Sequence, residues 1–402
     1  MRVLCYNHAP EISGAERSLL SIMRHAQGSG VRLLLCAPAG PLSDEARRLR
    51  LTVAPVAPLT LGYARNPLVL ARYLTGALRP VADLARVVRR ARPDLVYANS
   101  IRSGLVAALA LRLVRCRPRL IVHARDALGD GALDGLTAAA IGHEADRVVA
   151  ISAYVARGFA RRAGADKLRV LHNAIDPERY RFDAAKGRAF RARLGVPAAA
   201  PLLAVVGQLT PWKGQGEALE AVALLRRSHP DAHLVIAGAA KFTGKHRRYD
   251  TNAYRDALVA RARKPDLAGH VHFPGDVADA AAVYSAADLV VVPSWAEPFG
   301  RVVIEAMATG TPVLATTAGG VPEIITHGVD GWLVSPRDPT ALARGMARLL
   351  DDAPLRHKLA AVGRDAVEER FALADYMPAL EGMWREVAGD PAVRDAPVLP
   401  GR

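Results

Sequence analysis

Two glutamates with a fixed spacing, Glu297 and Glu305, are the residues of this sequence best suited to chemistry. A strand-like apolar run at 288–294 precedes Glu297, and Pro298 and Gly300 mark a turn into a helix-like run that carries Glu305. The first turn of such a helix presents unpaired backbone N–H groups, which bind anions. Two carboxylates beside an anion site suit a ligand with hydroxyl groups at both ends and phosphate between them. A nucleotide sugar has this chemistry.

The same stretch also has a simpler interpretation, which the residues alone leave open. Glu297 would then be a solvated loop residue, and Glu305 would stabilise the helix by its interaction with the helix dipole.

Three glycine-containing loops follow strand-like runs, at places where a phosphate group can bind. The first, around Gly14, opens a helix, so the backbone can approach an anion there. The second runs from Gly207 to Lys213, and the ammonium of Lys213 can neutralise a diphosphate. The third contains Gly319 and Gly320. A solvated surface lysine and an ordinary strand-to-helix turn are the alternatives for the second and third loops.

His123 ends a strand-like run at 120–123, where it can contact a substrate; a buried structural histidine is the alternative. The sequence contains no D-x-D triplet and no His, Cys, Asp or Glu cluster with ligand spacing, so we expect no metal site. A Walker loop and a recognisable Ser-His-Asp arrangement are also missing from the sequence.

Strand-like and helix-like runs alternate along the chain, which is typical of parallel α/β domains. The alternation is interrupted by a polar, Pro- and Ala-rich stretch at 173–201 and then resumes. Two doubly wound domains in tandem imply a ligand-binding cleft between them. The expected strands are 3–7, 31–36, 94–98, 120–123, 147–151, 168–171, 202–206, 233–237, 271–273, 289–292 and 312–315, and the expected helices include 15–26, 81–90 and 103–114.

Length and composition agree with two globular domains. The chain has 402 residues, of which 51% are hydrophobic, enough for two cores. Its three cysteines are far apart in the sequence, so we expect a reducing, cytoplasmic environment. The first eight residues resemble a strand and not a signal peptide, and no apolar run reaches the roughly 18 residues that a membrane span needs.

The positive charge is concentrated in the first half of the chain. Residues 1–185 contain 28 Lys and Arg against 15 Asp and Glu, a net charge of +13, whereas residues 186–402 contain 26 against 24, a net charge of +2. This asymmetry indicates an acidic partner: an anionic membrane surface, a phosphorylated acceptor or nucleic acid. A basic surface without a partner is the alternative. No basic-aromatic module supports nucleic acid, so we expect none to bind.

Together these motifs resemble the retaining glycosyltransferases of family 4, which have the GT-B fold: two Rossmann-like doubly wound domains that face each other across a cleft. The resemblance covers nearly the whole chain, and its most specific part is the E-x7-E motif of Glu297 and Glu305. It implies an acceptor-side domain at 1–180 with a helix at 376–389 packing back onto it, a donor-binding domain at 186–372 and a disordered tail at 390–402.

The resemblance also implies a role for each motif. His123, Lys213 and Glu297 would be catalytic: His123 would contact the donor sugar, Lys213 would bind the diphosphate and Glu297 would hold sugar hydroxyls. Glu305 would hold the ribose hydroxyls. The implied donor-binding residues are Gly14, Gly207, Gln208, Lys213, His272, Phe273, Glu297, Phe299, Gly300, Arg301, Val302 and Glu305, with the strand end at His272 and Phe273 bordering the base.

Gln208 departs from the family pattern, because an arginine that pairs with the diphosphate usually stands at this position. Arg301 or the basic segment 241–248 can compensate for the missing charge.

The expected reaction is the transfer of a sugar from a nucleotide-diphosphate sugar to a hydroxyl group of a sugar, glycolipid or small molecule, without a cofactor or a metal. Cell-surface polysaccharide, glycolipid or glycoside biosynthesis is the expected setting, in the cytoplasm or at the inner face of the membrane. A nucleotide-sugar epimerase of similar fold and a catalytically weak binding subunit are the alternatives.

Overall fold

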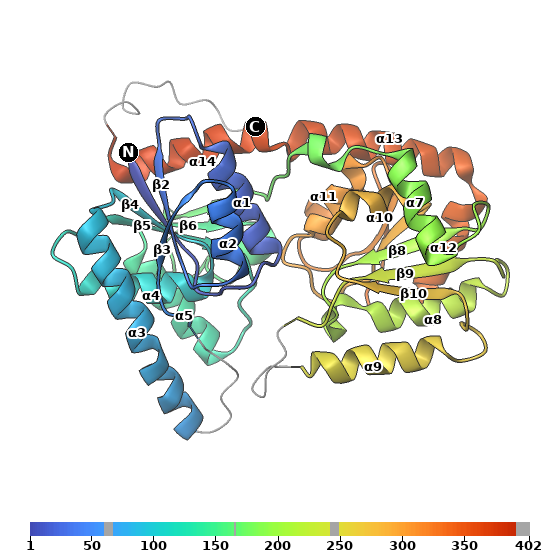
Figure 1. The fold of residues 1–402 in the computed structure, drawn as a ribbon, viewed down its shortest axis with the longest axis horizontal. Coiled ribbons are helices and arrows are strands. Elements are labelled where there is room, and N and C mark those ends of the chain that lie inside the picture. Colours follow the sequence, from blue (N-terminus) through green and yellow to red (C-terminus); the bar gives the residue numbers. More distant parts are fainter. Residues whose placement is uncertain (60–66, 165, 242–248, 391–402) are drawn as a thin grey trace. The chain divides into compact units, whose positions relative to one another are not determined.

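The structure, a computed structural model, describes residues 1–59, 67–164, 166–241 and 249–390, with the side chains of residues 67–75 left aside. These residues form two compact units (Figure 1). The first unit comprises Met1–Ala174 and the segment that begins at Leu373, and the second comprises Ile175–Ala372. The division after Ala174 lies earlier in the chain than the expected boundary at residue 180. Of the expected tail at 390–402, all but Asp390 lies outside the described residues.

The first unit is built on a parallel sheet, in which the described residues form seven strands in the order β3-β2-β1-β4-β5-β6-β7. Its inner strands β1, β4, β5 and β6 are short and largely buried, as strands covered by helices on both faces require, whereas the edge strands β3 and β7 are more exposed. Helices α1, α2 and α14 share one core with the sheet, whereas α4 contacts both α3 and α5 (Figure 1). The strands are β1 (Arg2–Tyr6), β2 (Arg32–Ala37), β3 (Thr52–Pro55), β4 (Leu95–Ala98), β5 (Arg119–Ala124), β6 (Arg147–Ala150) and β7 (Leu168–Val170). The helices are α1 (Gly14–His25), α2 (Pro41–Arg48), α3 (Pro67–Ala91), α4 (Ile101–Arg112), α5 (Ala132–Glu144), α6 (Ala153–Ala156) and α14 (Leu373–Ala388).

Helix α14 follows the whole second unit in sequence but packs on the first sheet. Its Trp384 is fully buried and lies edge-on to the Tyr97 ring of β4, with ring centroids 5.4 Å apart. An ion pair of 2.7 Å between Glu386 and Arg147 joins the helix to β6.

The second unit repeats this architecture, with six strands among its described residues in the order β10-β9-β8-β11-β12-β13. The strands are β8 (Leu202–Val206), β9 (His233–Ala237), β10 (Val271–Gly275), β11 (Leu289–Val292), β12 (Val313–Thr316) and β13 (Trp332–Val334). The helices are α7 (Ala184–Leu194), α8 (Gln215–Leu225), α9 (Thr251–Ala262), α10 (Ala280–Ala286), α11 (Arg301–Ala308), α12 (Pro339–Asp351) and α13 (Ala353–Arg370), with the short turns η1 (Pro177–Tyr180), η2 (Pro211–Lys213) and η3 (Val321–Glu323).

The strand order fixes where a ligand can bind. In open parallel sheets, ligands bind beyond the carboxyl ends of the strands at the point where the order reverses. In the second unit this point lies between β8 and β11, which lead into the loops with Lys213 and Glu297. In the first unit it lies between β1 and β4.

Two elements are longer than expected. The helix expected at 81–90 begins at Pro67 and continues through Pro80. Strand β10 extends past the expected 271–273 to Gly275 and includes Pro274, which an edge strand tolerates because one side of its backbone needs no partner. Among the described residues, no helix has the length and hydrophobicity needed to cross a membrane.

Candidate active site

Backbone contacts fix the loop that carries Glu297, between β11 and α11. The N–H of Gly320 donates to the carbonyl oxygen of Glu297 at 2.8 Å, and the N–H of Trp295 donates to the carbonyl oxygen of Trp212 at 2.8 Å. Gly319 has a φ of +61°, and a Cβ atom there would lie 2.0 Å from the Glu297 carbonyl oxygen. The third glycine loop, with Gly319 and Gly320, therefore holds the Glu297 loop in place, since only glycine permits so close an approach of the two backbones.

Glu297 forms an ion pair with Lys213, which lies in the turn after β8. Their Nζ and Oε2 atoms are 2.5 Å apart, and the Ser294 hydroxyl donates to the same carboxylate oxygen at 3.1 Å. The Glu297 side chain is buried. Lys213 also lies over the Trp212 ring, with its ammonium 4.5 Å from the ring centroid. Two of the residues expected to be catalytic are thus in direct contact.

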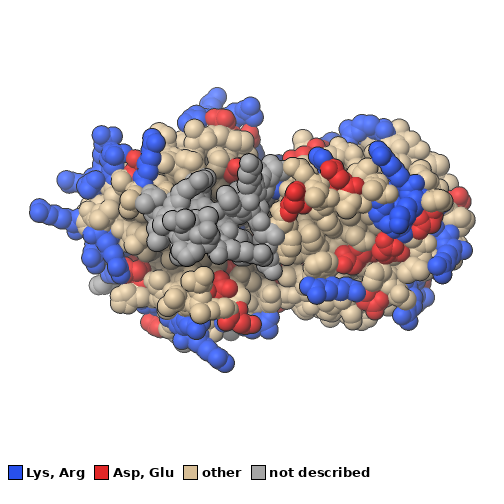
Figure 2. All heavy atoms as spheres, turned by 90° about the horizontal axis from the view of Figure 1, so that it is seen from below, with Lys and Arg blue, Asp and Glu red and all other residues tan. Residues whose placement is uncertain are grey.

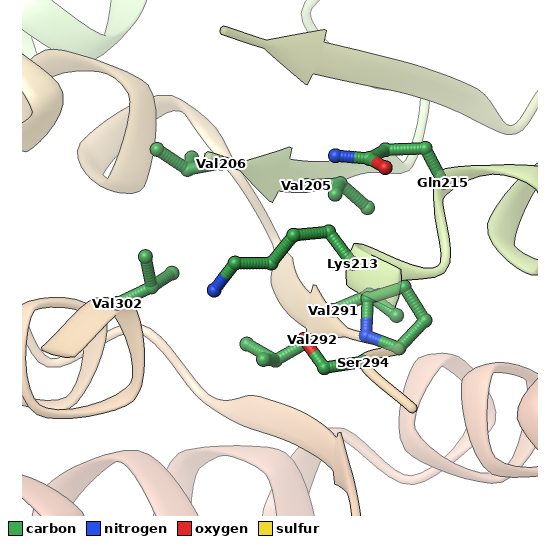
Figure 3. A pocket seen from close by; sticks show the side chains of 9 residues that line it. Val205, Val206, Lys213, Gln215, Val291, Val292, Ser294 and Val302 are labelled. Carbon is green, nitrogen blue, oxygen red and sulfur yellow. The ribbon is translucent and has the colours of Figure 1, made fainter. Parts of the chain in front are cut away.

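Lys213 points into a pocket at the carboxyl ends of β8 and β11 (Figure 3). Its ammonium extends between the side chains of Val302 and Ser294. The lining residues are Val205, Val206, Lys213, Gln215, Val291, Val292, Pro293, Ser294 and Val302. The pocket therefore offers a cation and a hydroxyl against an apolar wall.

Glu305 lies in a second buried cluster on α11. Arg301 Nη2 donates to Glu305 Oε1 at 2.8 Å, and the Tyr284 hydroxyl donates to Glu305 Oε2 at 3.0 Å. Burial, and secondarily the Glu305 charge, raises the pKa of Tyr284 well above its usual value, so Tyr284 stays protonated and donates. Burial alone would lower the pKa of Arg301, but the neighbouring Glu305 raises it, so the Arg301 guanidinium stays charged.

The loop after β8 brings two glycines into close approach. Gly207 has a φ of +148° and Gly238 a φ of +159°, and a Cβ atom on Gly238 would lie 1.8 Å from the Gly207 carbonyl oxygen. The next carbonyl, that of Gln208, accepts a hydrogen bond from Gln215 Nε2 at 2.9 Å. The backbone of residue 208 is therefore anchored, whereas its side chain is half-buried.

The remaining predicted donor-binding residues differ in their structural surroundings. Gly300 caps α11 with a φ of +115°. The Phe299 ring is buried edge-on to Phe371, so this ring contributes packing at the start of α11. His272 is the second residue of β10 and lies 3.0 Å from His233, while Phe273 packs against the core of the unit. The stretch 272–273 is therefore mid-strand, and the expectation that it ends the strand was wrong, because β10 continues through Pro274.

Gly14 begins α1, as the sequence predicts, but the first turn of this helix already holds a carboxylate. The Ser13 N–H donates to Glu16 Oε2 at 3.0 Å, and Glu16 is buried. The Gly14 loop was expected to bind an anion, and that expectation did not take the acidic side chain of Glu16 into account.

In the first unit, His123 is fully buried on β5 next to Tyr97. The Tyr97 hydroxyl hydrogen-bonds the His123 Nδ1, whereas the Nε2 atom is buried and has no hydrogen-bond partner among the described residues. Burial, followed by the charge of Arg125, lowers the pKa of His123 well below its usual value. His123 is therefore neutral.

A buried polar network beside His123 was not predicted. Arg125 Nε donates to Asn99 Oδ1 at 2.7 Å, and its Nη1 donates to Asn173 Oδ1 at 2.8 Å and to the Ser18 hydroxyl at 3.1 Å. Asn99 in turn donates to Asn7 Oδ1 at 3.0 Å. In the sequence, the sign of this network is a polar residue directly after each of three strands: Asn7 after β1, Asn99 after β4 and Arg125 after β5.

Comparisons with known proteins agree for both units. The family model described as Glycosyltransferase Family 4 matches residues 12–179, and the model described as Glycosyl transferases group 1 matches residues 188–366. Crystal structures of HepE from Anabaena, one in complex with UDP-glucose, are similar in fold, with a TM-score of 0.83, 26% identity, and coverage of 96% of this chain and 100% of that chain. A sucrose-phosphate synthase from Thermosynechococcus elongatus shares the fold at 21% identity and a TM-score of 0.79, with coverage of 96% of this chain and 99% of that chain.

Curated relatives match parts of the chain at higher identity. The D-inositol 3-phosphate glycosyltransferase 2 of Catenulispora acidiphila is 36% identical over 293 residues, 68% of this chain and 66% of the relative. The D-inositol 3-phosphate glycosyltransferase of Corynebacterium glutamicum is 37% identical over 210 residues, 51% of this chain and 48% of the relative. The matched regions thus span between about half and just under two thirds of these two relatives. The predicted fold class, two doubly wound α/β domains of the GT-B type, is confirmed, and the chain belongs to the glycosyltransferases of family 4.

Proposed function

We propose that this protein transfers a sugar from a nucleotide-diphosphate sugar to a hydroxyl acceptor. The observation that carries this proposal is the Lys213–Glu297 ion pair beside Ser294, in the loops where the strand order of the second sheet reverses. A cation at this place would bind the diphosphate, and a carboxylate beside it would accept hydrogen bonds from sugar hydroxyls. The second unit is accordingly the donor-binding domain, and the first is the acceptor-side domain.

Lys213 would stabilise the leaving group. As the glycosidic bond breaks, negative charge grows on the diphosphate, and a fixed ammonium in a water-poor pocket stabilises that charge. In the structure this ammonium is held by Glu297, so the donor diphosphate would share Lys213 with a carboxylate that is already in place. Glu297 would keep its remaining acceptor capacity for sugar hydroxyls.

Glu305 would hold the ribose hydroxyls of the donor. Its carboxylate is paired with Arg301 and oriented by Tyr284, so it can accept further hydrogen bonds without rearranging. Gly207 and Gly300 would let the backbone approach the ligand in the same unit.

We further propose that the transfer retains the anomeric configuration and needs no divalent metal. Neither the sequence nor the site offers an evident covalent nucleophile, so a same-face substitution is the proposed course, and Lys213 supplies the charge that a metal would otherwise supply. NMR of the first-formed product gives its anomeric configuration. Assays before and after exhaustive chelation test the second point: activity that is lost and then restored by Mg²⁺ or Mn²⁺ contradicts it.

The relatives' names favour a phosphorylated small-molecule acceptor. They are D-inositol 3-phosphate glycosyltransferases, and the basic excess of residues 1–185 agrees with an acidic acceptor. We therefore place inositol phosphate first among the acceptors, ahead of a glycolipid or a growing polysaccharide.

A donor and acceptor screen tests the proposed function. Purified protein is incubated with UDP- and GDP-sugars, with and without inositol phosphate, and products are identified by mass spectrometry. A sugar-acceptor conjugate is the expected result. An isomerised donor formed without acceptor would indicate an epimerase, and a thermal shift with UDP but no turnover would indicate a binding subunit.

An anionic membrane surface is the proposed additional partner of the first unit. Five exposed leucines lie on, or directly after, the neighbouring helices α3, α4 and α5: Leu78, Leu109, Leu113, Leu133 and Leu136. Residues 76–119 carry ten arginines and two aspartates. Figure 2, seen from the side of these helices, shows Lys and Arg side chains at the margin of this face. Each basic residue near an anionic leaflet contributes about 1 kcal/mol to binding.

Co-sedimentation with vesicles tests this partner. Vesicles with anionic lipid should retain the protein at low salt and release it at higher salt, whereas neutral vesicles should not retain it. Equal, negligible binding to both kinds of vesicle would leave a soluble acidic acceptor as the partner of the basic surface.

A further inference from the structure

Arg125 is a buried cation whose described hydrogen-bond partners are all neutral. Its side chain donates to Asn99, Asn173 and Ser18, and its Nη2 atom is buried with no hydrogen-bond partner in the described part of the chain. Among the described residues no carboxylate forms a hydrogen bond or ion pair with it. The residue itself is 5% exposed.

Stability alone does not account for an arginine at this position. A buried charge carries a desolvation penalty, and a nearby carboxylate usually offsets it. An apolar side chain of similar length would avoid that penalty, whereas an arginine offers a planar group that bonds several oxygens at once. The role of Arg125 is therefore better explained by the elements that its hydrogen bonds join.

The network connects the elements that carry the proposed first-unit site residues. Arg125 follows β5, two residues after His123, and Ser18 lies on α1, which Gly14 begins. Asn99, directly after β4, donates to Asn7 after β1 and to the Ala15 carbonyl oxygen at 3.3 Å. Asn173 belongs to the last residues of the unit before the chain enters the second one.

We propose that Arg125 is a positioning residue for the transfer reaction, which fixes the Gly14 end of α1 against the His123 end of β5. It acts through Ser18 and Asn99, so it needs no contact with the substrate. This inference rests on the proposed function in so far as its effect is seen in turnover, but the geometry that it sets can be measured without turnover.

The test compares Arg125→Met with a matched control, Arg147→Met. Arg147 is also a buried arginine of the first sheet, but it lies at the amino end of β6, whereas Arg125 follows the carboxyl end of β5, and it pairs with Glu386. In hydrogen exchange, we expect faster exchange of the α1 amides from Arg17 to Leu20 in Arg125→Met and unchanged exchange there in Arg147→Met. Unchanged exchange of these amides in Arg125→Met would overturn the proposal whether or not the protein is active.

Kinetics give the second readout. Arg125→Met should lower kcat about tenfold or more while the donor KM stays within about twofold, because misplacement of a reacting group affects the transition state most. Arg147→Met should keep the kcat of the folded protein. If the two variants show the expected difference in exchange but the wild-type protein transfers no sugar, the proposed function fails. The role of Arg125 in positioning α1 against β5 then still stands.

A second variant keeps the test decisive if Arg125→Met does not fold. Arg125→Lys retains the charge but cannot bond Asn99 and Asn173 through one planar group. It should therefore still show faster exchange in α1 and a reduced kcat. A lysine variant with wild-type exchange and wild-type kcat would overturn the proposal.

Discussion

The cations at the two proposed sites have opposite kinds of partner. In the second unit, Lys213 faces Glu297 and Arg301 faces Glu305, each within hydrogen-bond distance. In the first unit, Arg125 donates to two amide oxygens and a hydroxyl, and none of its described partners is a carboxylate. An anionic ligand of the second unit must therefore share its cation with a resident carboxylate, whereas the charge of Arg125 is not neutralised locally.

This difference predicts where each unit is sensitive. Removing one member of a buried ion pair leaves the other charged and unpaired, which costs about 3–5 kcal/mol. Removing a cation from neutral partners strands no opposite charge. Substitutions in the second unit should therefore act on folding and turnover together, and those in the Arg125 network mainly on turnover.

Glu305→Ala should have the largest effect, on the stability of the second unit. It leaves the Arg301 guanidinium buried without its carboxylate, so we expect the free energy of unfolding to fall by about 3–5 kcal/mol. In the folded protein, nucleotide affinity should fall by about 1–3 kcal/mol, the range for a hydrogen bond to a charged group.

Glu368→Ala is the matched control for this change. Arg364 and Glu368 have the same four-residue spacing as Arg301 and Glu305, but they are exposed, so their loss should cost about 0.5 kcal/mol or less. Urea unfolding followed by circular dichroism measures both variants. A similar, small loss in the two would mean that Glu305 and Arg301 are not the buried pair that we describe.

Lys213→Ala should reduce turnover most. The variant removes the proposed leaving-group cation, and the loss of one preorganised group of this kind typically lowers kcat about 100- to 1000-fold. Lys186→Ala removes a lysine of the same unit that pairs with Asp279 on the surface, and it should keep full activity. If Lys213→Ala retained the kcat of the Lys186 variant, Lys213 would have no part in the chemistry.

Much of the fold could be predicted from the sequence, because strands of a parallel sheet are buried on both faces and read as short apolar runs. The runs at 95–98, 233–237 and 289–292 lie within the expected strands. The strands Thr52–Pro55 and Trp332–Val334 were missed, since they are short and lie at the sheet edges. The start of α3 was missed because Pro80 interrupts the helical pattern.

The candidate site was predictable where it depends on local spacing and not where it depends on strand order. The Glu297–Glu305 spacing and the turn at Gly300 are local, and the structure keeps both. The Arg125 network joins residues far apart in the chain: Asn7 and Asn99 meet only because β1 pairs with β4. The Arg301–Glu305 pair is also local, but Arg301 was expected only as a donor-binding residue that can compensate for Gln208, and not as the partner of Glu305.

Gly319→Ala should have an intermediate effect, on the position of the second unit's ion pair. A Cβ atom at residue 319 collides with the Glu297 carbonyl oxygen, so the Glu297 loop must shift and kcat should fall about tenfold. Gly328→Ala is the control: its φ of +75° carries a similar backbone strain, but no atom lies within 4 Å of an added Cβ. Equal kcat values in the two variants would show that the Glu297 loop tolerates displacement.

Gln208→Arg should have the smallest effect, and it tests whether a second cation is missing beside Lys213. The backbone of residue 208 is anchored by Gln215, so a longer side chain there starts from a fixed point at the carboxyl edge of β8. An added guanidinium near the diphosphate should raise kcat by about tenfold or less, because Lys213 already supplies one charge and a flexible surface cation gains little. Gln208→Glu places the opposite charge at the same point and should lower kcat by a similar factor, with both effects weakened by salt. Arg301 is hydrogen-bonded to Glu305, so Arg301→Met should reduce stability as well as turnover. If Arg301 were instead a diphosphate ligand that compensates for Gln208, Arg301→Met would reduce turnover alone. If kcat is the same in both residue-208 variants, residue 208 does not lie near the diphosphate, and the second unit carries only the Lys213 charge at that position.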